Sequence, residues 1–265
     1  MKLFNLFLIE VKRRFIMMKR YPLDTIMGMA FLYIFFLFIF LGGKNGLVNF
    51  GKTPIEFGNS VTSLILGFIV FQTSMMAFGS LARSIDREIK TGTLEQVFLN
   101  PFGLSIVLFI RSVAFIAIQL FFIFFWITVL SLTTGVYFKL STVFLAVPFI
   151  ILTIIGIQGI GLIMTSLLLI FKKVDIINSL MSMSLIPLAV LPSHINNDFI
   201  YFIPLSGGLK LIRKLFIDGE SFFAILFSYG TSMVILTSAI LLCIGLIFFK
   251  AAEQRARHSA NLGQY

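Results

Sequence analysis

A short charged segment interrupts a chain that is otherwise rich in phenylalanine, isoleucine and leucine. Residues 84–101 read SIDREIKTGTLEQVFLNP and include five ionisable side chains. Gly92 suits the left-handed position that ends a helix, and Thr93 begins TLEQ, which matches the S/T-x-x-E/Q capping box. The pattern predicts a helix up to the glycine, a break, and a second short helix capped by Thr93 and Gln96. An amphipathic element of this kind can insert into a groove on another protein.

Few other side chains could take part in chemistry. Inside the apolar runs the strongest polar candidates are Gln72, Gln119 and Gln158. They could line a translocation path, although hydrogen bonds between helices are an equally physical role for them. The two histidines, His194 and His258, are far apart in sequence, and neither CxxC nor HExxH spacing occurs. The sequence therefore predicts no catalytic residue and no metal site.

The composition indicates a membrane protein. Of 265 residues, 58% are hydrophobic and 12% are charged, and the mean hydropathy is +1.04. Soluble domains are nearer to half apolar and a quarter charged, so a soluble fold could not bury this much apolar surface. The net charge of +10 comes from cations that flank apolar runs. Membrane topology explains that placement better than nucleic-acid binding, and we expect lipid contact and no nucleic-acid partner.

Six apolar runs are long enough to cross a bilayer, which takes about 20 helical residues. Backbone polar groups must be satisfied internally in lipid, so each run is predicted to be an α-helix. We therefore expect an all-α integral membrane protein with one transmembrane domain over residues 1–265. The predicted parts are an amphipathic interfacial helix at 1–22, six spans at about 24–42, 58–82, 104–133, 143–170, 176–193 and 222–249, the charged segment at 84–100, and an outer helical loop at 198–220.

The lysines and arginines set the predicted orientation. Fifteen lie on the side that holds both termini and six on the opposite side. Cytoplasmic loops carry the excess of positive charge, so both termini and the charged segment are predicted to be cytoplasmic, in a multi-pass protein of the cell membrane. Arg111 and Asp24 lie near predicted span ends, where they could reach the interface by snorkelling.

Two further patterns concern helix packing. After Pro204, apolar residues follow one helical face and basic residues another, and Gly219 is a suitable stop. This amphipathic helix is expected to be either interfacial or partly re-entrant. In the fourth run, Gly156, Gly159 and Gly161 are expected to allow close helix packing.

Residues 87–112, REIKTGTLEQVFLNPFGLSIVLFIRS, resemble the cytoplasmic loop of type-2 ATP-binding-cassette export permeases. The family shows Gly-Thr-Leu-Glu-Gln followed by a proline, here residues 92–96 and Pro101, and the resemblance extends over the whole chain. In the family this loop is the coupling helix, which docks on the ATPase subunit. The resemblance implies an ATP-driven exporter subunit whose ATPase-coupling residues are Asp86, Arg87, Glu88, Gly92, Thr93, Leu94, Glu95 and Gln96. We call residues 84–100 the coupling segment.

The partners follow from the same resemblance. No G-x-x-x-x-G-K-[ST] phosphate loop occurs, and GGKNG at 42–46 has the wrong spacing. The chain is therefore expected to be no enzyme and to bind no cofactor, with ATP and Mg²⁺ on a partner ATPase subunit. A second permease subunit, identical or related, would complete the path.

Two other functional classes compete with this interpretation. An ion-coupled secondary transporter or channel usually has an ionisable residue at the centre of a span, and the predicted spans have none there. A membrane enzyme acting on lipid would need a polar catalytic cluster, which the sequence does not contain. The charge-poor spans suit an amphipathic or lipid-like cargo, such as a drug, a peptide or a lipid-linked glycan, and equally suit ordinary lipid contact.

Overall fold

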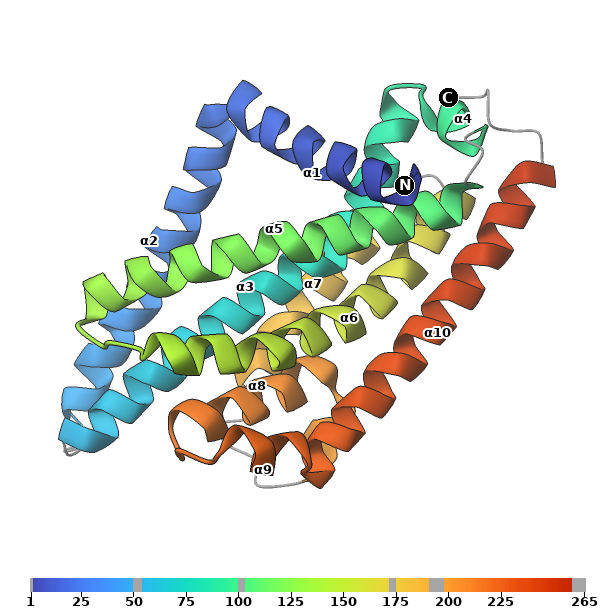
Figure 1. Ribbon diagram of the computed structural model, residues 1–265. Coiled ribbons are helices and arrows are strands. Elements are labelled where there is room, and N and C mark those ends of the chain that lie inside the picture. The colour runs from blue at the N-terminus through green and yellow to red at the C-terminus, as the bar shows by residue number, and fades with distance from the viewer. Residues whose placement is uncertain (1, 50–53, 100–102, 172–174, 191–197, 259–265) are drawn as a thin grey trace.

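The computed structural model describes residues 2–49, 54–99, 103–171, 175–190 and 198–258, and every regular element in those ranges is a helix (Figure 1). Five of the helices are long and apolar enough to cross a membrane. The prediction of an α-helical membrane protein is therefore confirmed. In chain order the elements are α1 (Lys2–Arg20), α2 (Pro22–Asn49), α3 (Pro54–Lys90), α4 (Leu94–Phe98), α5 (Gly103–Thr134), α6 (Leu140–Phe171), α7 (Asp175–Val190), the 3₁₀ helix η2 (Asp198–Phe202), α8 (Pro204–Phe216), α9 (Phe222–Leu226) and α10 (Tyr229–His258).

The fifth predicted span, at 176–193, falls on α7. Over the described residues α7 has 16 residues, fewer than the roughly 20 that a crossing needs, and it is not one of the five long apolar helices. Residues 191–193 of that predicted span lie outside the described part of the chain. The structure therefore supports five spans by length and composition, and the sixth stays a prediction.

The last predicted span, at 222–249, is divided in the structure. Phe227 and Ser228 separate α9 from α10, and the Ser228 hydroxyl accepts a hydrogen bond from the backbone N–H of Thr231 at 3.3 Å. This is the bond by which a serine caps the first turn of a helix, so a new helix starts at Tyr229. The long helix then continues to His258, nine residues past the predicted end. A run without charged residues predicts how long an apolar segment is, but it does not show that one helix ends and another begins within the segment.

The centre of the bundle is built from α3, α6, α8 and α10. Helix α8 packs among α3, α6, α7 and α10, and Leu205, Leu209 and Leu211 are fully buried. Its position below α6 is visible in Figure 1. A helix surrounded in this way matches the re-entrant alternative better than one lying on the surface.

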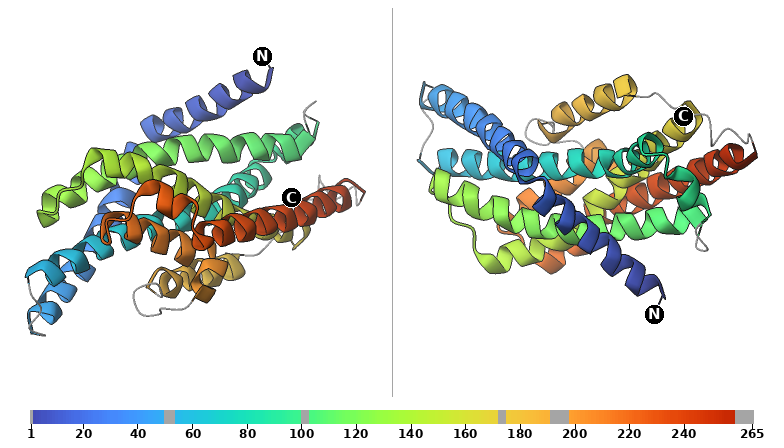
Figure 2. Two further views of the ribbon diagram at one scale, coloured as in Figure 1. Left: turned by 60° about the horizontal axis from the view of Figure 1, so that its bottom comes forward. Right: turned by 90° about the horizontal axis from the view of Figure 1, so that it is seen from above.

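Helix α1 presents a charged face to the bundle and an apolar face outward. Glu10 is buried and Arg13 is half-buried, whereas Phe4 and Ile9 are 64% and 59% exposed. Figure 2 shows α1 lying across α5, with which it packs. Outward apolar side chains suit a helix embedded in the membrane surface. The side of α1 that carries Glu10 and Arg13 therefore meets protein groups, whereas Lys12 and Lys19 are exposed on the outer side.

Candidate functional site

The glycine break in the coupling segment has the predicted geometry. Gly92 has a φ of 67° and lies two residues after the end of α3, which continues unbroken from the second predicted span to Lys90. The Gly92 N–H donates to the Ile89 carbonyl at 3.0 Å, and the Thr93 N–H donates to the Glu88 carbonyl at 2.9 Å. These two bonds define the Schellman motif, in which a left-handed glycine lets the chain reverse over the last helical turn.

Thr93 does not use its polar groups as the capping box predicts. Its N–H is occupied by the Glu88 carbonyl, and its hydroxyl donates to Glu88 Oε2 at 2.5 Å. The Schellman turn brings the Thr93 side chain next to the Glu88 side chain. In most Schellman motifs two apolar side chains meet at these positions, and here Thr93 and Glu88 form a hydrogen bond instead. Helix α4 still starts here, since the Thr93 carbonyl accepts from the Val97 N–H at 3.3 Å.

A buried ion cluster joins the end of α3 to α1 and α5. It consists of Glu10, Arg13, Glu88 and Arg111. Arg111 donates from Nε to Glu10 at 3.0 Å and from Nη2 to Glu88 at 2.9 Å, and its Nη1 donates to Ser84 at 2.8 Å. Arg13 Nη2 reaches the same Glu88 oxygen at 3.2 Å. Two carboxylates and two guanidinium groups balance one another, which lets charge be buried here.

Arg111 therefore does not snorkel to an interface as predicted. Its side chain is 6% exposed, because it is enclosed by the carboxylates of α1 and α3. The guanidinium satisfies several donors at once in a planar fork, a geometry that a lysine ammonium could not reproduce.

The predicted coupling residues divide into buried and exposed sets. Glu88 and Leu94 are buried, and we interpret them as residues that hold the segment in place. Asp86 is half-buried and pairs with Lys90 at 2.6 Å. Of the remaining residues, Arg87, Gly92 and Gln96 are exposed and Thr93 is half-buried, while Asn100 and the side chain of Glu95 lie outside the described part of the structure.

Leu94 anchors the short helix α4 in an apolar cluster at one end of the bundle. The cluster collects the ends of α3, α5, α6 and α10, including Leu104 and Phe249. Beside it, Ser105 donates to Glu253 Oε2 at 2.5 Å, which ties the start of α5 to α10. Figure 1 shows α4, the start of α1 and the last turns of α10 at this same end.

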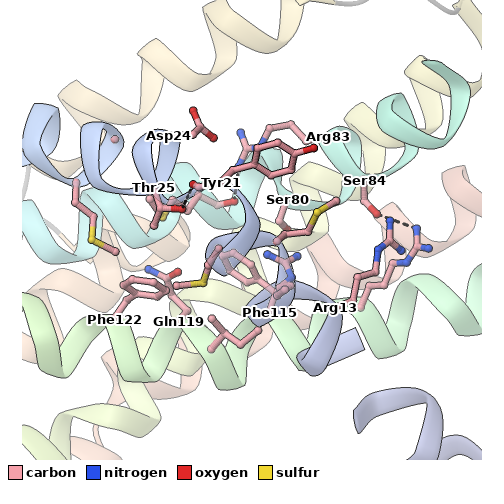
Figure 3. A pocket seen from close by; sticks show the side chains of 18 of the residues that line it. Arg13, Tyr21, Asp24, Thr25, Ser80, Arg83, Ser84, Phe115, Gln119 and Phe122 are labelled. Carbon is pink, nitrogen blue, oxygen red and sulfur yellow. Dashed lines mark hydrogen bonds between the residues drawn. The ribbon is translucent and has the colours of Figure 1, made fainter. Parts of the chain in front are cut away.

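A cavity of about 860 Å³ lies between α1, α2, α3 and α5 (Figure 3). We call it the basic cavity, because five arginines and two acidic residues line it. Two of the three predicted path residues, Gln72 and Gln119, are in its wall. Gln119 makes a long hydrogen bond of 3.5 Å to Thr73, and within the described residues Gln72 Oε1 has no hydrogen-bond partner.

Gln158 lies elsewhere. It accepts a hydrogen bond from the Ser112 hydroxyl at 2.6 Å, which joins α6 to α5. This is the interhelical bond that was the alternative role for the three glutamines. The structure therefore brings Gln72 and Gln119 together at the cavity and assigns Gln158 to helix packing.

Comparison with known proteins supplies the family. The model of the ABC-2 type transporter family matches residues 5–204, about three quarters of the chain. The chain belongs to the ABC-2 type transporter family. This confirms the resemblance seen in the sequence and makes the protein a multi-pass membrane permease of ABC type. Neither the curated proteins nor the solved structures give a match.

The match to the ABC-2 family includes α1, α3, α4 and α5, the helices that build the ion cluster and the coupling segment. Family membership implies association of the permease with ABC ATPase partners. Sequence reasoning missed Glu10 as a member of the ion cluster. The sequence feature that could have indicated Glu10 is that it is the only acidic residue before Asp24, in a strongly basic stretch.

Proposed function

We propose that this permease is the membrane-spanning subunit of an ATP-driven exporter, and that the coupling segment receives the motion of a separate ATPase subunit. Membership of the ABC-2 family supports the class of transporter. The sequence has no phosphate-loop motif, which agrees with ATP and Mg²⁺ being bound by the partner. In this proposal α7 is the sixth crossing, both termini are cytoplasmic in the cell membrane, and a second permease subunit completes the path.

The observation that carries the proposal is the way α4 is tied to the bundle. Glu88 bonds Thr93 at the start of α4 and also bonds Arg13 and Arg111 on two other helices. Leu94 packs against the ends of α3, α5, α6 and α10. A displacement of α4 is therefore expected to move several helix ends together, as rigid-body switching requires.

The proposed partner surface consists of the exposed residues of this end. Arg87 and Gln96 are exposed in the structure. Glu95 lies in α4 between the buried Leu94 and the exposed Gln96. Charge and amide groups at the rim of an interface favour correct registration of the two partners. The buried Glu88 and Leu94 support this surface from below.

Crosslinking tests the proposal directly. The only cysteine, Cys243, is replaced by serine, and Gln96→Cys is introduced on the exposed side of α4. We expect a crosslink to the co-purified ATPase subunit whose yield changes with ATP. Tyr137→Cys is the matched control, because Tyr137 is 81% exposed in the loop between α5 and α6. Absence of any crosslink from Gln96→Cys in an intact complex would refute the docking surface.

Charge reversal at Glu95 tests the role of this residue. Glu95→Lys is expected to weaken ATPase association by about tenfold, or to separate ATP hydrolysis from transport, since rim charges steer partner binding. The spans should stay folded, because α4 has only five residues. Association is measured by pull-down at two salt concentrations, and thermal unfolding checks the fold. Normal association together with normal transport would contradict the assignment of Glu95.

A further inference from the structure

The basic cavity is most basic at one end, and the two acidic residues in its wall are Glu10 and Asp24. Arg83 and Arg87 of α3 lie toward the coupling segment, and Gln72 lies at the other end of the cavity wall on the same helix. From Arg87 to Gln72 is 15 residues, or about 22 Å of helix. On α5 the wall runs the same way, from Arg111 to Phe122 and Trp126. The cavity is thus basic at one end and more apolar toward Phe122 and Trp126, and its extent along α3 is enough for one leaflet, which is about 15 Å of hydrocarbon.

Three of the five arginines lack an acidic partner. Arg13 and Arg111 belong to the ion cluster, but over the described residues Arg14, Arg83 and Arg87 form no ion pair with a carboxylate. Arg14 stacks on the Phe115 ring at 5.2 Å. Burial lowers the pKa of Arg14, and the neighbouring cations Arg83 and Arg87 act in the same direction, against Glu10. An anion placed among these three guanidinium groups would relieve their mutual repulsion.

Arg83 is held in the cavity by a local feature of α3. Its Nη2 donates to the Met76 carbonyl at 3.1 Å, seven residues earlier, so the side chain folds back along the helix. Gly79 makes room for this path, because a Cβ at that position would lie 2.1 Å from Arg83 Nη1. Figure 3 shows Arg83 and Ser80 on one side and Phe115, Gln119 and Phe122 on another.

We propose that the basic cavity binds an anionic amphiphile, specifically a lipid with a phosphate headgroup. The phosphate would lie at Arg14, Arg83 and Arg87, and the apolar part would follow α5 toward Phe122 and Trp126. Guanidinium groups match the geometry and charge of phosphate oxygens. A soluble phosphate would use the charged end alone and would leave the rest of an 860 Å³ cavity unfilled. The proposal concerns binding by the permease itself and does not depend on ATPase coupling.

The single tryptophan of the chain provides the measurement. Trp126 lines the cavity, so its fluorescence reports on occupancy of the less polar end. The full-length permease is placed in nanodiscs of phosphatidylcholine that contain a small fraction of phosphatidylglycerol with brominated acyl chains, which quench tryptophan on contact. We expect saturable quenching at low mole fraction, and much weaker quenching by brominated phosphatidylcholine at the same fraction.

Three variants assign the effect to the cavity. Arg83→Gln with Arg87→Gln is expected to weaken lipid binding by about thirtyfold, given the contribution of each basic residue to anionic-lipid binding. Lys12→Gln with Lys19→Gln is the matched control, because it removes two cations of the exposed face of α1 that do not line the cavity. Gly79→Ala keeps every charge and favours the helix, but it displaces the Arg83 guanidinium and should weaken binding by a smaller factor.

Each alternative result decides against the proposal. Equal quenching by the two brominated lipids would show ordinary lipid contact at Trp126. Equal losses in the cavity and control double variants would show general attraction to the α1 surface. Displacement of the brominated lipid by inorganic phosphate as readily as by unbrominated phosphatidylglycerol would identify a soluble phosphate as the ligand. If Gly79→Ala binds the lipid as well as the wild type does, Arg83 does not contact the phosphate.

Discussion

Replacing Arg111 with glutamine is expected to destabilise the folded permease by about 3–5 kcal/mol, the usual result of removing one partner from a buried ion pair. The variant would leave the carboxylates of Glu10 and Glu88 buried, and among the described residues Arg13 would be their remaining ion-pair partner. Arg13 is a weak substitute, because its side chain is 36% exposed and its distance to Glu10 is 3.7 Å. The measurement is thermal unfolding of the purified chain in one detergent, with an expected decrease of about 6–20 °C.

The combination Glu10→Gln, Glu88→Gln and Arg111→Gln separates charge from packing. It removes all three buried charges, so it should recover most of the stability lost by Arg111→Gln alone. Lys12→Gln is the control on the outer face of α1, since Lys12 is exposed and belongs to no ion pair in the described structure, and its effect should stay within about 0.5 kcal/mol. A triple variant no more stable than the single one would show that the ion cluster is not what stabilises this end of the bundle.

The same variants have a functional consequence. Since Glu88 bonds both Thr93 and Arg111, loss of Arg111 is expected to loosen the start of α4 as well. Hydrogen exchange of the α4 amides should therefore rise in Arg111→Gln and return toward the wild-type rate in the triple variant.

Features that depend on local backbone physics could be predicted from the sequence. The break at Gly92 is set by the conformation of one residue, and the third and fourth predicted spans agree within a few residues with α5 and α6, because both are long, mainly apolar segments. The family resemblance was also carried by a short local motif. The close packing predicted for Gly159 and Gly161 is confirmed by the backbone atoms that face them.

Features that depend on distant partners could not be predicted in this way. Glu10, Glu88 and Arg111 are separated by tens of residues, and each alone resembles a charge at a membrane interface. What excludes that interpretation is their mutual neutralisation, which appears only once α1 lies across α5. The same holds for Thr93, whose use of Glu88 as a partner follows from the Schellman turn and not from the TLEQ spacing.

Gly159→Ala is expected to destabilise the protein although alanine favours helices, because Gly159 lies at a close contact between α6 and α10. A Cβ at this position would lie 2.6 Å from the backbone carbonyl carbon of Leu241 and 2.6 Å from the backbone nitrogen of Leu242. These are backbone atoms of α10 and cannot move aside alone, so α6 and α10 must separate. Overpacking costs about 1–3 kcal/mol, and because the contact is with backbone we expect the upper part of this range, which exceeds the gain of about 1 kcal/mol in helix propensity.

The matched control for Gly159→Ala is Gly42→Ala, because nothing lies within 4 Å of a Cβ at Gly42 in α2. It should leave the unfolding temperature unchanged or raise it slightly. Separation of α10 from α6 would also reach the coupling end, since Phe249 and Glu253 of α10 contact the apolar cluster of Leu94 and the start of α5. Gly159→Ala should therefore lower the unfolding temperature and increase hydrogen exchange in α4 together. A loss of stability with unchanged exchange in α4 would show that α10 does not support the coupling segment.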